Sequence, residues 1–117
     1  ATNCPYMNEG IVVKSHAGQK YTSDAVSIAV FKDLCKKANV PVQFFANRSD
    51  EAGGSTLGNI AMAQVSMNSV DIGLPQLAMH STYETAGIKD TYYMIQVMTE
   101  FFNSHISEVN SHSLKVD

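Results

Sequence analysis

The chain has 117 residues, 44% of them hydrophobic, with eight basic and eleven acidic side chains. This length suits a single domain with a modest core, and the balanced charge gives no reason to expect a nucleic acid or an acidic membrane as a partner. No apolar run approaches the ~20 residues of a membrane span and the N-terminus lacks a signal-peptide pattern, so we expect a cytoplasmic chain without membrane contact.

The first predicted unit is a strand followed by a helix. Residues 11–15 (IVVKS) are a β-branched run, with Lys14 expected at the end of the strand. Ser23 is expected to cap a helix that stops at Asn39, because its hydroxyl can accept hydrogen bonds from the first free amides. Apolar residues recur in this segment at helical spacing, at Ala25, Val26, Ala29, Val30 and Leu34.

The second unit repeats this order. Residues 42–46 (VQFFA) predict a strand, and Ser55 or Thr56 is expected to cap the next helix. A narrow stripe of apolar residues in this helix consists of Leu57, Ile60, Ala61 and Val65. Such a stripe would let the helix lie close to a sheet.

A third strand is predicted at residues 70–74, and Asp90 is expected to cap the last helix. The widest apolar face in the chain belongs to this helix and contains Met94, Val97, Met98, Phe101 and Phe102. The polar residues after His105 predict a frayed tail. Three strands alternating with three helices indicate a three-layer α/β/α segment with right-handed crossovers, and residues 1–117 form one unit.

The two cysteines and three of the histidines are not expected to form a functional site. Cys4 and Cys35 lack the spacing of a zinc knuckle or a redox motif, and we expect both thiols to be reduced. His16, His105 and His112 are interpreted as surface residues.

The segment 70–84 (VDIGLPQLAMHSTYE) is the main candidate for chemistry. Pro75 ends regular strand pairing because it has no N–H, and His80 follows in a loop after a strand, where α/β proteins often place functional residues. From the residues alone His80 has three roles open to it: metal ligand, general base or solvated loop residue.

Three motifs in this order carry a resemblance: 12–27 (VVKSHAGQKYTSDAVS), 47–58 (NRSDEAGGSTLG) and 74–84 (LPQLAMHSTYE). Together they resemble the C-terminal part of the aspartyl aminopeptidase family, zinc metallo-aminopeptidases that include the vacuolar aminopeptidase I type. The resemblance implies that this segment belongs to a larger zinc-exopeptidase catalytic domain. It also implies a homo-oligomer acting on peptide substrates.

The resemblance assigns roles to four residues. His80 corresponds to the last metal ligand of a site that holds two zinc ions in the intact enzyme. Lys14 would lie at the pocket for the substrate's first side chain, where a cation favours Asp or Glu, and the loop at Gly54 and Ser55 would border the active site. The other ligands and the general base lie upstream in the family, so no catalytic residue is expected in this segment and the isolated chain should be inactive.

Departures from the family pattern leave alternatives open. Lys20 replaces an arginine, Asn59 a proline and Tyr83 an arginine. One alternative is a related aminopeptidase with a preference for neutral residues, which keeps His80 and differs in what Lys14 meets. The other is a non-catalytic α/β binding or assembly module.

Overall fold

The computed structural model describes residues 4–16, 23–47, 57–65, 67–110 and 113–117. The elements in chain order are β1 (Ile11–His16), α1 (Ala25–Ala38), β2 (Val42–Asn47), α2 (Leu57–Gln64), β3 (Asp71–Gly73), β4 (Gln76–Leu77), β5 (Thr85–Ala86), α3 (Ile88–Asn103), β6 (Ile106–Asn110) and β7 (Ser113–Val116). This confirms the predicted α/β class with its three helices. Within the described residues, none of these helices combines the length and apolarity needed to span a bilayer.

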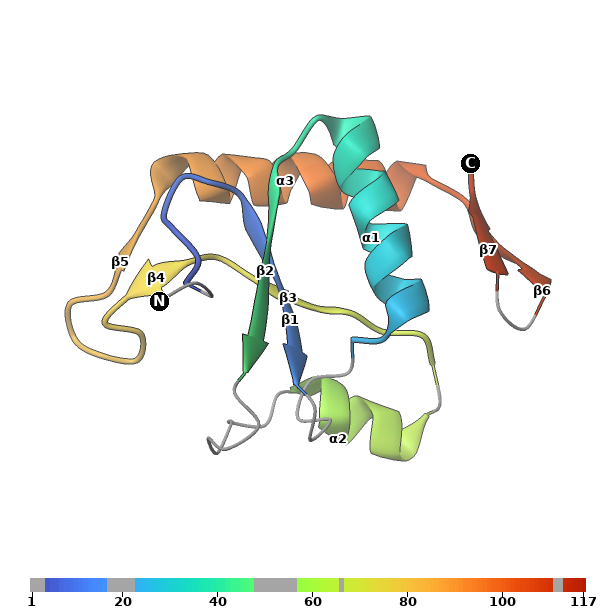
Figure 1. The fold of residues 1–117 in the computed structure, drawn as a ribbon, viewed down its shortest axis with the longest axis horizontal. Coiled ribbons are helices and arrows are strands. Elements are labelled where there is room, and N and C mark those ends of the chain that lie inside the picture. The colour runs from blue at the N-terminus through green and yellow to red at the C-terminus, as the bar shows by residue number, and fades with distance from the viewer. Residues whose placement is uncertain (1–3, 17–22, 48–56, 66, 111–112) are drawn as a thin grey trace.

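The main sheet has the strand order β2-β1-β3. β1 and β2 are parallel, with Ile11 opposite Val42, as a strand-helix-strand unit requires. β3 pairs with β1 in the antiparallel direction, with Lys14 opposite Asp71, so the crossover predicted between the second and third strands was wrong. Figure 1 shows the reason: α2 lies at the end of the sheet where β1 finishes, so the chain enters β3 from that end and runs back.

Helix α1 begins one residue later than predicted. Its N-cap is Asp24, whose carboxylate accepts a hydrogen bond from the N–H of Ser27 at 2.8 Å, while the Ser27 hydroxyl accepts from the N–H of Asp24 at 3.0 Å. This reciprocal pair satisfies two otherwise free donors. Ser23, the predicted cap, instead accepts from the N–H of Asp71 at 2.7 Å and ties the start of α1 to β3. Asn39 ends the helix in the left-handed conformation, as expected.

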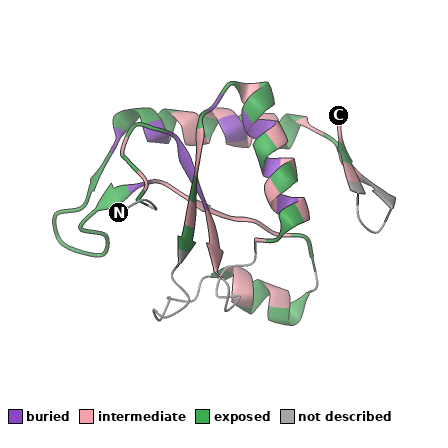
Figure 2. Ribbon diagram, in the orientation of Figure 1, coloured by how far each residue is buried: buried purple, intermediate pink, exposed green. Residues whose placement is uncertain are grey.

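The core lies where α1 and α3 meet β1. Its buried residues are Ile11, Val13, Phe31, Leu34, Cys35, Val40 and Val97. In Figure 1, α1 runs beside the strands and α3 crosses the end of the sheet where β1 and β2 begin. Figure 2 shows the buried positions concentrated in β1, α1 and α3. Alternation along β1 therefore turns Ile11 and Val13 toward the helices and Val12 and Lys14 toward the opposite face.

Two loops meet tightly at Gly10. This residue has φ of 120°, and a Cβ atom built on it would lie 2.2 Å from the carbonyl oxygen of Pro41. The next residue, Ile11, donates its N–H to that same oxygen at 3.1 Å. Only glycine combines this backbone angle with so close an approach, and the contact brings the starts of β1 and β2 together.

Helix α2 does not use its apolar stripe as predicted. Leu57, Ile60 and Val65 are 81%, 62% and 59% exposed, and none of the residues in α2 is buried. Figure 2 likewise shows no buried position in this helix. The prediction that α2 packs closely on a sheet is wrong for the chain as it stands, because the helix lies beyond the strand ends.

The C-terminal residues form a hairpin and not a frayed tail. β6 and β7 pair in the antiparallel direction, and His105 and Asp117 exchange two backbone hydrogen bonds of 2.9 and 2.8 Å. Ile106 and Val116 pack against the core, and Lys37 of α1 donates to the carbonyl of Val116 at 3.0 Å. The sequence did not predict these strands because only a few apolar residues alternate in this segment and most of their neighbours are polar.

Helix α3 also starts differently from the prediction. Its N-cap is Gly87, which makes no side-chain cap, and Asp90 lies within the first turn. Asp90 is completely buried and binds the N-terminal segment, as described below.

Candidate functional site

The face of the sheet opposite α1 carries a pocket that contains Lys14. Its volume is about 340 Å³. The residues that line it are Cys4, Pro5, Val12, Lys14, Phe45, Leu74, Pro75, Gln76, Leu77 and Met79. The walls thus come from the N-terminal segment, the two parallel strands and the segment that leads to the His80 loop. Most of the lining is apolar, and Lys14 is the one charged residue among the described residues that form it. The charge of Lys14 therefore influences which side chains the pocket can bind.

Lys14 lies in the interior of β1, since the strand continues to His16 and does not end at Lys14 as predicted. Its neighbours across the sheet are Phe45 on β2 and Asp71 on β3. A Cβ atom added to Gly73 would lie 3.0 Å from Cε and 3.1 Å from Nζ of Lys14. The absence of a side chain at Gly73 therefore provides the space in which the end of Lys14 lies. Sequence reasoning missed Gly73, although a glycine within a predicted strand often marks such a close approach.

The segment that leads into β1 is tied to the sheet and to α3 by polar contacts. Gln43 of β2 accepts a hydrogen bond from the N–H of Tyr6 at 2.8 Å and donates to the carbonyls of Tyr6 and Gly10 at 2.9 and 3.1 Å. The Asp90 carboxylate accepts from the N–H groups of Asn8 and Gly10 at 2.7 and 3.0 Å. These contacts hold residues 6–10 in place, directly after the wall residues Cys4 and Pro5.

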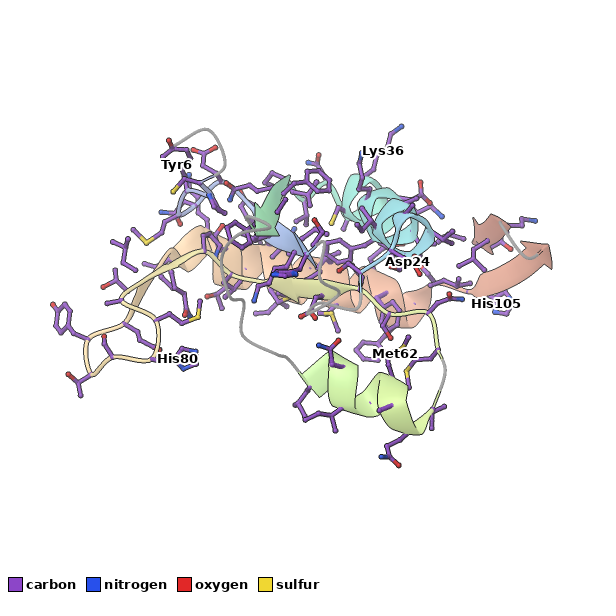
Figure 3. All side chains as sticks on the ribbon, turned by 60° about the horizontal axis from the view of Figure 1, so that its bottom comes forward. Tyr6, Asp24, Lys36, Met62, His80 and His105 are labelled. Carbon is purple, nitrogen blue, oxygen red and sulfur yellow. The ribbon has the colours of Figure 1, made fainter. Side chains whose placement is uncertain are left out.

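His80 lies in the exposed loop between β4 and β5, directly after the pocket residue Met79. Ala78 and His80 have φ of 53° and 68°, and Ser81 donates its N–H to the carbonyl of Ala78 at 3.0 Å. The Glu84 carboxylate accepts a hydrogen bond from the N–H of His80. Figure 3 shows the His80 side chain standing clear of the other labelled residues. The loop backbone is thus ordered by local hydrogen bonds, while the imidazole is accessible.

A zinc ion fits His80 only as one ligand among several. Zinc sites in proteins are built from about four ligands, of which at least three come from protein in catalytic sites. Within the part of the chain that the structure describes, no three His, Cys, Asp or Glu residues are grouped closely enough to hold a metal. Glu84, the nearest acidic neighbour in the loop, is bound to the His80 backbone. The remaining ligands would have to come from elsewhere.

The other predicted positions have mixed outcomes. Gly54 and Ser55 lie outside the described residues, as does His112. His105 is exposed, as expected, whereas His16 is the last residue of β1 and half-buried, which corrects its interpretation as a surface residue.

Both cysteines are free, as expected. Cys4 is exposed in the pocket wall. Burial raises the pKa of the Cys35 thiol from its ordinary value of 9.0 to about 11, which keeps it neutral and unreactive.

Comparison with known sequences identifies a family and relatives. The family described as "Aminopeptidase I zinc metalloprotease (M18)" matches residues 1–102. A relative named "Probable M18 family aminopeptidase 2" from Clostridium novyi (strain NT) is 55% identical over 102 residues, which cover 87% of this chain and 24% of the relative. A protein of the same name from Clostridium acetobutylicum is 50% identical over 99 residues, which cover 85% of this chain and 23% of the relative. The chain therefore spans about a quarter of the length of these relatives.

Solved structures share the fold. A chain in "Cryo-EM structure of the Ape4 and Nbr1 complex" gives a TM-score of 0.83 at 39% identity, covering 86% of this chain and 19% of that chain. "Crystal structure of prApe1" gives 0.81 at 27% identity, covering 88% of this chain and 22% of that chain. "Structure of S. cerevesiae mApe1 dodecamer" gives a TM-score of 0.74 at 26% identity, covering 88% of this chain and 22% of that chain. With 102 of its 117 residues matched, this chain belongs to the M18 family of aminopeptidase I zinc metalloproteases.

Proposed function

We propose that this chain supplies the C-terminal part of the active site of a zinc aminopeptidase. The observation that supports the proposal is the family match over residues 1–102, which includes the His80 loop and the pocket beside it. In this role the chain contributes one imidazole ligand and one substrate pocket. The general base and the remaining ligands belong to the rest of such an enzyme, so the isolated chain is inactive.

His80 acts as a neutral imidazole ligand. When bound, zinc polarises the scissile carbonyl and lowers the pKa of a water molecule, and the proposed enzyme uses two such ions. The contribution of this chain is to present the ring. The hydrogen bond from the His80 N–H to Glu84 and the bond from Ser81 to Ala78 fix the loop backbone from which the imidazole projects.

Lys14 selects the substrate. Its ammonium group lies beside Gly73 at a pocket with apolar walls, where an acidic side chain at the N-terminus of a peptide finds a partner for its charge. A charge-assisted hydrogen bond of this kind contributes about 2 kcal/mol. The proposed preference is therefore for Asp or Glu. The family resemblance also assigns Gly54 and Ser55 to substrate binding, and both lie outside the described residues.

The same family membership supports a homo-oligomer. The solved mApe1 relative is described as a dodecamer, and we propose that an enzyme containing this chain also assembles from copies of itself.

The test uses a chimaera in which this chain replaces the matching quarter of the Clostridium novyi relative. His80→Ala should lower zinc affinity by at least about 100-fold, since even the outer partners of metal ligands contribute 10–100-fold. Zinc content after dialysis and hydrolysis of aspartyl and leucyl substrates are measured. His105→Ala, at another exposed histidine, serves as the control.

Lys14→Met tests the substrate preference in the same chimaera. The kcat/KM for the aspartyl substrate should fall by about 30-fold while that for the leucyl substrate changes little, since about 2 kcal/mol of charge pairing is lost. A chimaera that hydrolyses both substrates equally before and after the change would favour the neutral-residue aminopeptidase. An inactive chimaera that retains no zinc would favour the binding module.

A further inference from the structure

Helix α3 has a second apolar face that is exposed to solvent. It consists of Ile88, Tyr92, Ile95 and Phe102, which we call the outer stripe. Their exposed fractions are 89%, 61%, 59% and 76%, and with Thr99 they recur at alternating spacings of four and three residues along the helix. Residues at this spacing lie along one side of a helix. The stripe therefore follows one side of α3, interrupted by Thr99 between Ile95 and Phe102, and is not a scatter of single exposed residues.

The opposite side of α3 is already used by the core. Val97 is completely buried, and Tyr93, Met94 and Met98 pack against the core cluster. A helix with apolar residues on both sides is usually covered on both sides. Among the described residues only the side that packs on the core is covered. A ridge of this kind marks an interaction surface.

A second copy of this chain is a poor fit for the outer stripe. α3 has 16 residues and is about 24 Å long. Its four large side chains offer roughly 500 Å² of still exposed surface, below the ~800 Å² per partner of a stable interface. If two copies of the outer stripe faced each other, the flanking positions would be Lys89, Thr91, Gln96, Met98 and Asn103. Of these only Lys89 is charged. Paired helices that associate with themselves usually carry complementary charges at such positions.

The relatives suggest a different occupant. The outer stripe lies within the region matched to the family, yet the aligned segment is only 24% of the Clostridium novyi protein. We propose that the outer stripe of α3 is an internal packing surface of the M18 fold and binds an apolar surface from the part of the aminopeptidase chain outside this segment. This rests on the family membership and does not depend on zinc binding, substrate preference or activity.

Chemical labelling of single cysteines tests the proposal. Ile95→Cys is introduced into the isolated chain and into the chimaera described above, both carrying Cys4→Ser so that the remaining native thiol of this segment is the buried Cys35, and the labelled peptide is identified after digestion. The rate of reaction with a maleimide is measured by mass spectrometry. Lys36→Cys, exposed near the end of α1, is the control for general access. Phe102→Cys probes the far end of the stripe in case the first variant perturbs the helix.

The expected result is rapid labelling of Ile95→Cys in the isolated chain and protection in the chimaera. Protection should exceed that of Lys36→Cys by at least about tenfold, since modification of a covered side chain waits for local opening. Equal labelling in both proteins would overturn the proposal. Protection in the isolated chain that increases with its concentration would also overturn it, because the occupant would then be a second copy. Neither readout requires hydrolytic activity, so a failure of the proposed function leaves this test intact.

Discussion

The carboxylate of Asp90 accepts a hydrogen bond of 3.0 Å from the backbone N–H of Gly10, although 80 residues separate them in sequence. Its other oxygen accepts from the N–H of Asn8 at 2.7 Å, and Asn8 in turn accepts from the N–H of Lys89 at 3.0 Å. The start of α3 and the segment before β1 thus satisfy each other's backbone donors. A completely buried carboxylate is tolerated here because both oxygens are hydrogen-bonded.

The first prediction concerns this contact. Asp90→Asn keeps the size of the side chain but turns an NH₂ group toward one of the two backbone N–H donors. The free energy of unfolding should fall by about 2–3 kcal/mol, the cost of leaving a buried donor unsatisfied and losing a charged acceptor. Urea denaturation followed by circular dichroism measures the change. The control is Asp33→Asn, whose carboxylate is 3.9 Å from the Lys37 ammonium in an exposed pair. It should cost less than about 0.5 kcal/mol.

A second prediction addresses the start of α1. Asp24→Ala removes the acceptor for the N–H of Ser27 and should destabilise the chain by about 1 kcal/mol. Amide hydrogen exchange should rise in the first turn of α1 before it rises in α3. An unchanged free energy of unfolding would mean that water replaces the cap at no cost.

The third prediction is a pH dependence. The folded state holds the pKa of Cys35 near 11, whereas the unfolded thiol titrates near 9.0. Between these values the unfolded chain loses its proton first, so the stabilising effect of the neutral thiol is complete below about pH 9 and is lost as pH rises toward 11. A pKa difference of about two units corresponds to a loss of about 3 kcal/mol. Cys35→Ala should be less stable at pH 7, but its free energy of unfolding should not show this decrease between pH 9 and 11. The measurement is the free energy of unfolding of both proteins between pH 7 and 11. If it decreased in parallel for the two proteins, the prediction would be wrong.

A fourth prediction links Gly73 to the selectivity proposed for Lys14. In Gly73→Ala the new methyl group would lie 3.0 Å from Cε of Lys14, so the flexible end of the lysine must move. Stability should change by less than about 1 kcal/mol, while the ratio of kcat/KM for aspartyl over leucyl substrates in the chimaera should fall about fivefold. Gly58→Ala, on α2, is the matched control and should leave the ratio unchanged. An unaltered ratio in Gly73→Ala would show that the selectivity does not depend on the Lys14 side chain lying beside Gly73.

Local patterns in the sequence were sufficient for the elements whose signals are local. The β-branched run at 11–15, the apolar periodicity of α1 and the stop at Asn39 all predicted structure that is present. The direction of β3 could not be predicted, because it depends on where α2 lies relative to the sheet and not on the residues of β3. The same holds for the outer stripe, since the spacing reveals an apolar face but not what covers it.

For the candidate site, the motifs located His80 and Lys14 but not the residues that arrange them. Asp90 carries the sequence pattern of a helix cap, and its actual contact with Gly10 joins segments that are distant in sequence. Gly73 likewise matters through the side chain of Lys14 on the neighbouring strand. Such pairings arise only once the strands are placed side by side.

The close approach at Gly10 has a consequence for sequence variation in the family. Any L-amino acid at position 10 would combine an unfavourable backbone angle with a Cβ only 2.2 Å from the carbonyl oxygen of Pro41. Substitutions on the opposing loop cannot relieve the collision, because the obstructing atom belongs to the backbone, which every residue type shares. We therefore expect divergent homologues to retain glycine here while Pro41 itself varies freely, so this position should help to align remote sequences.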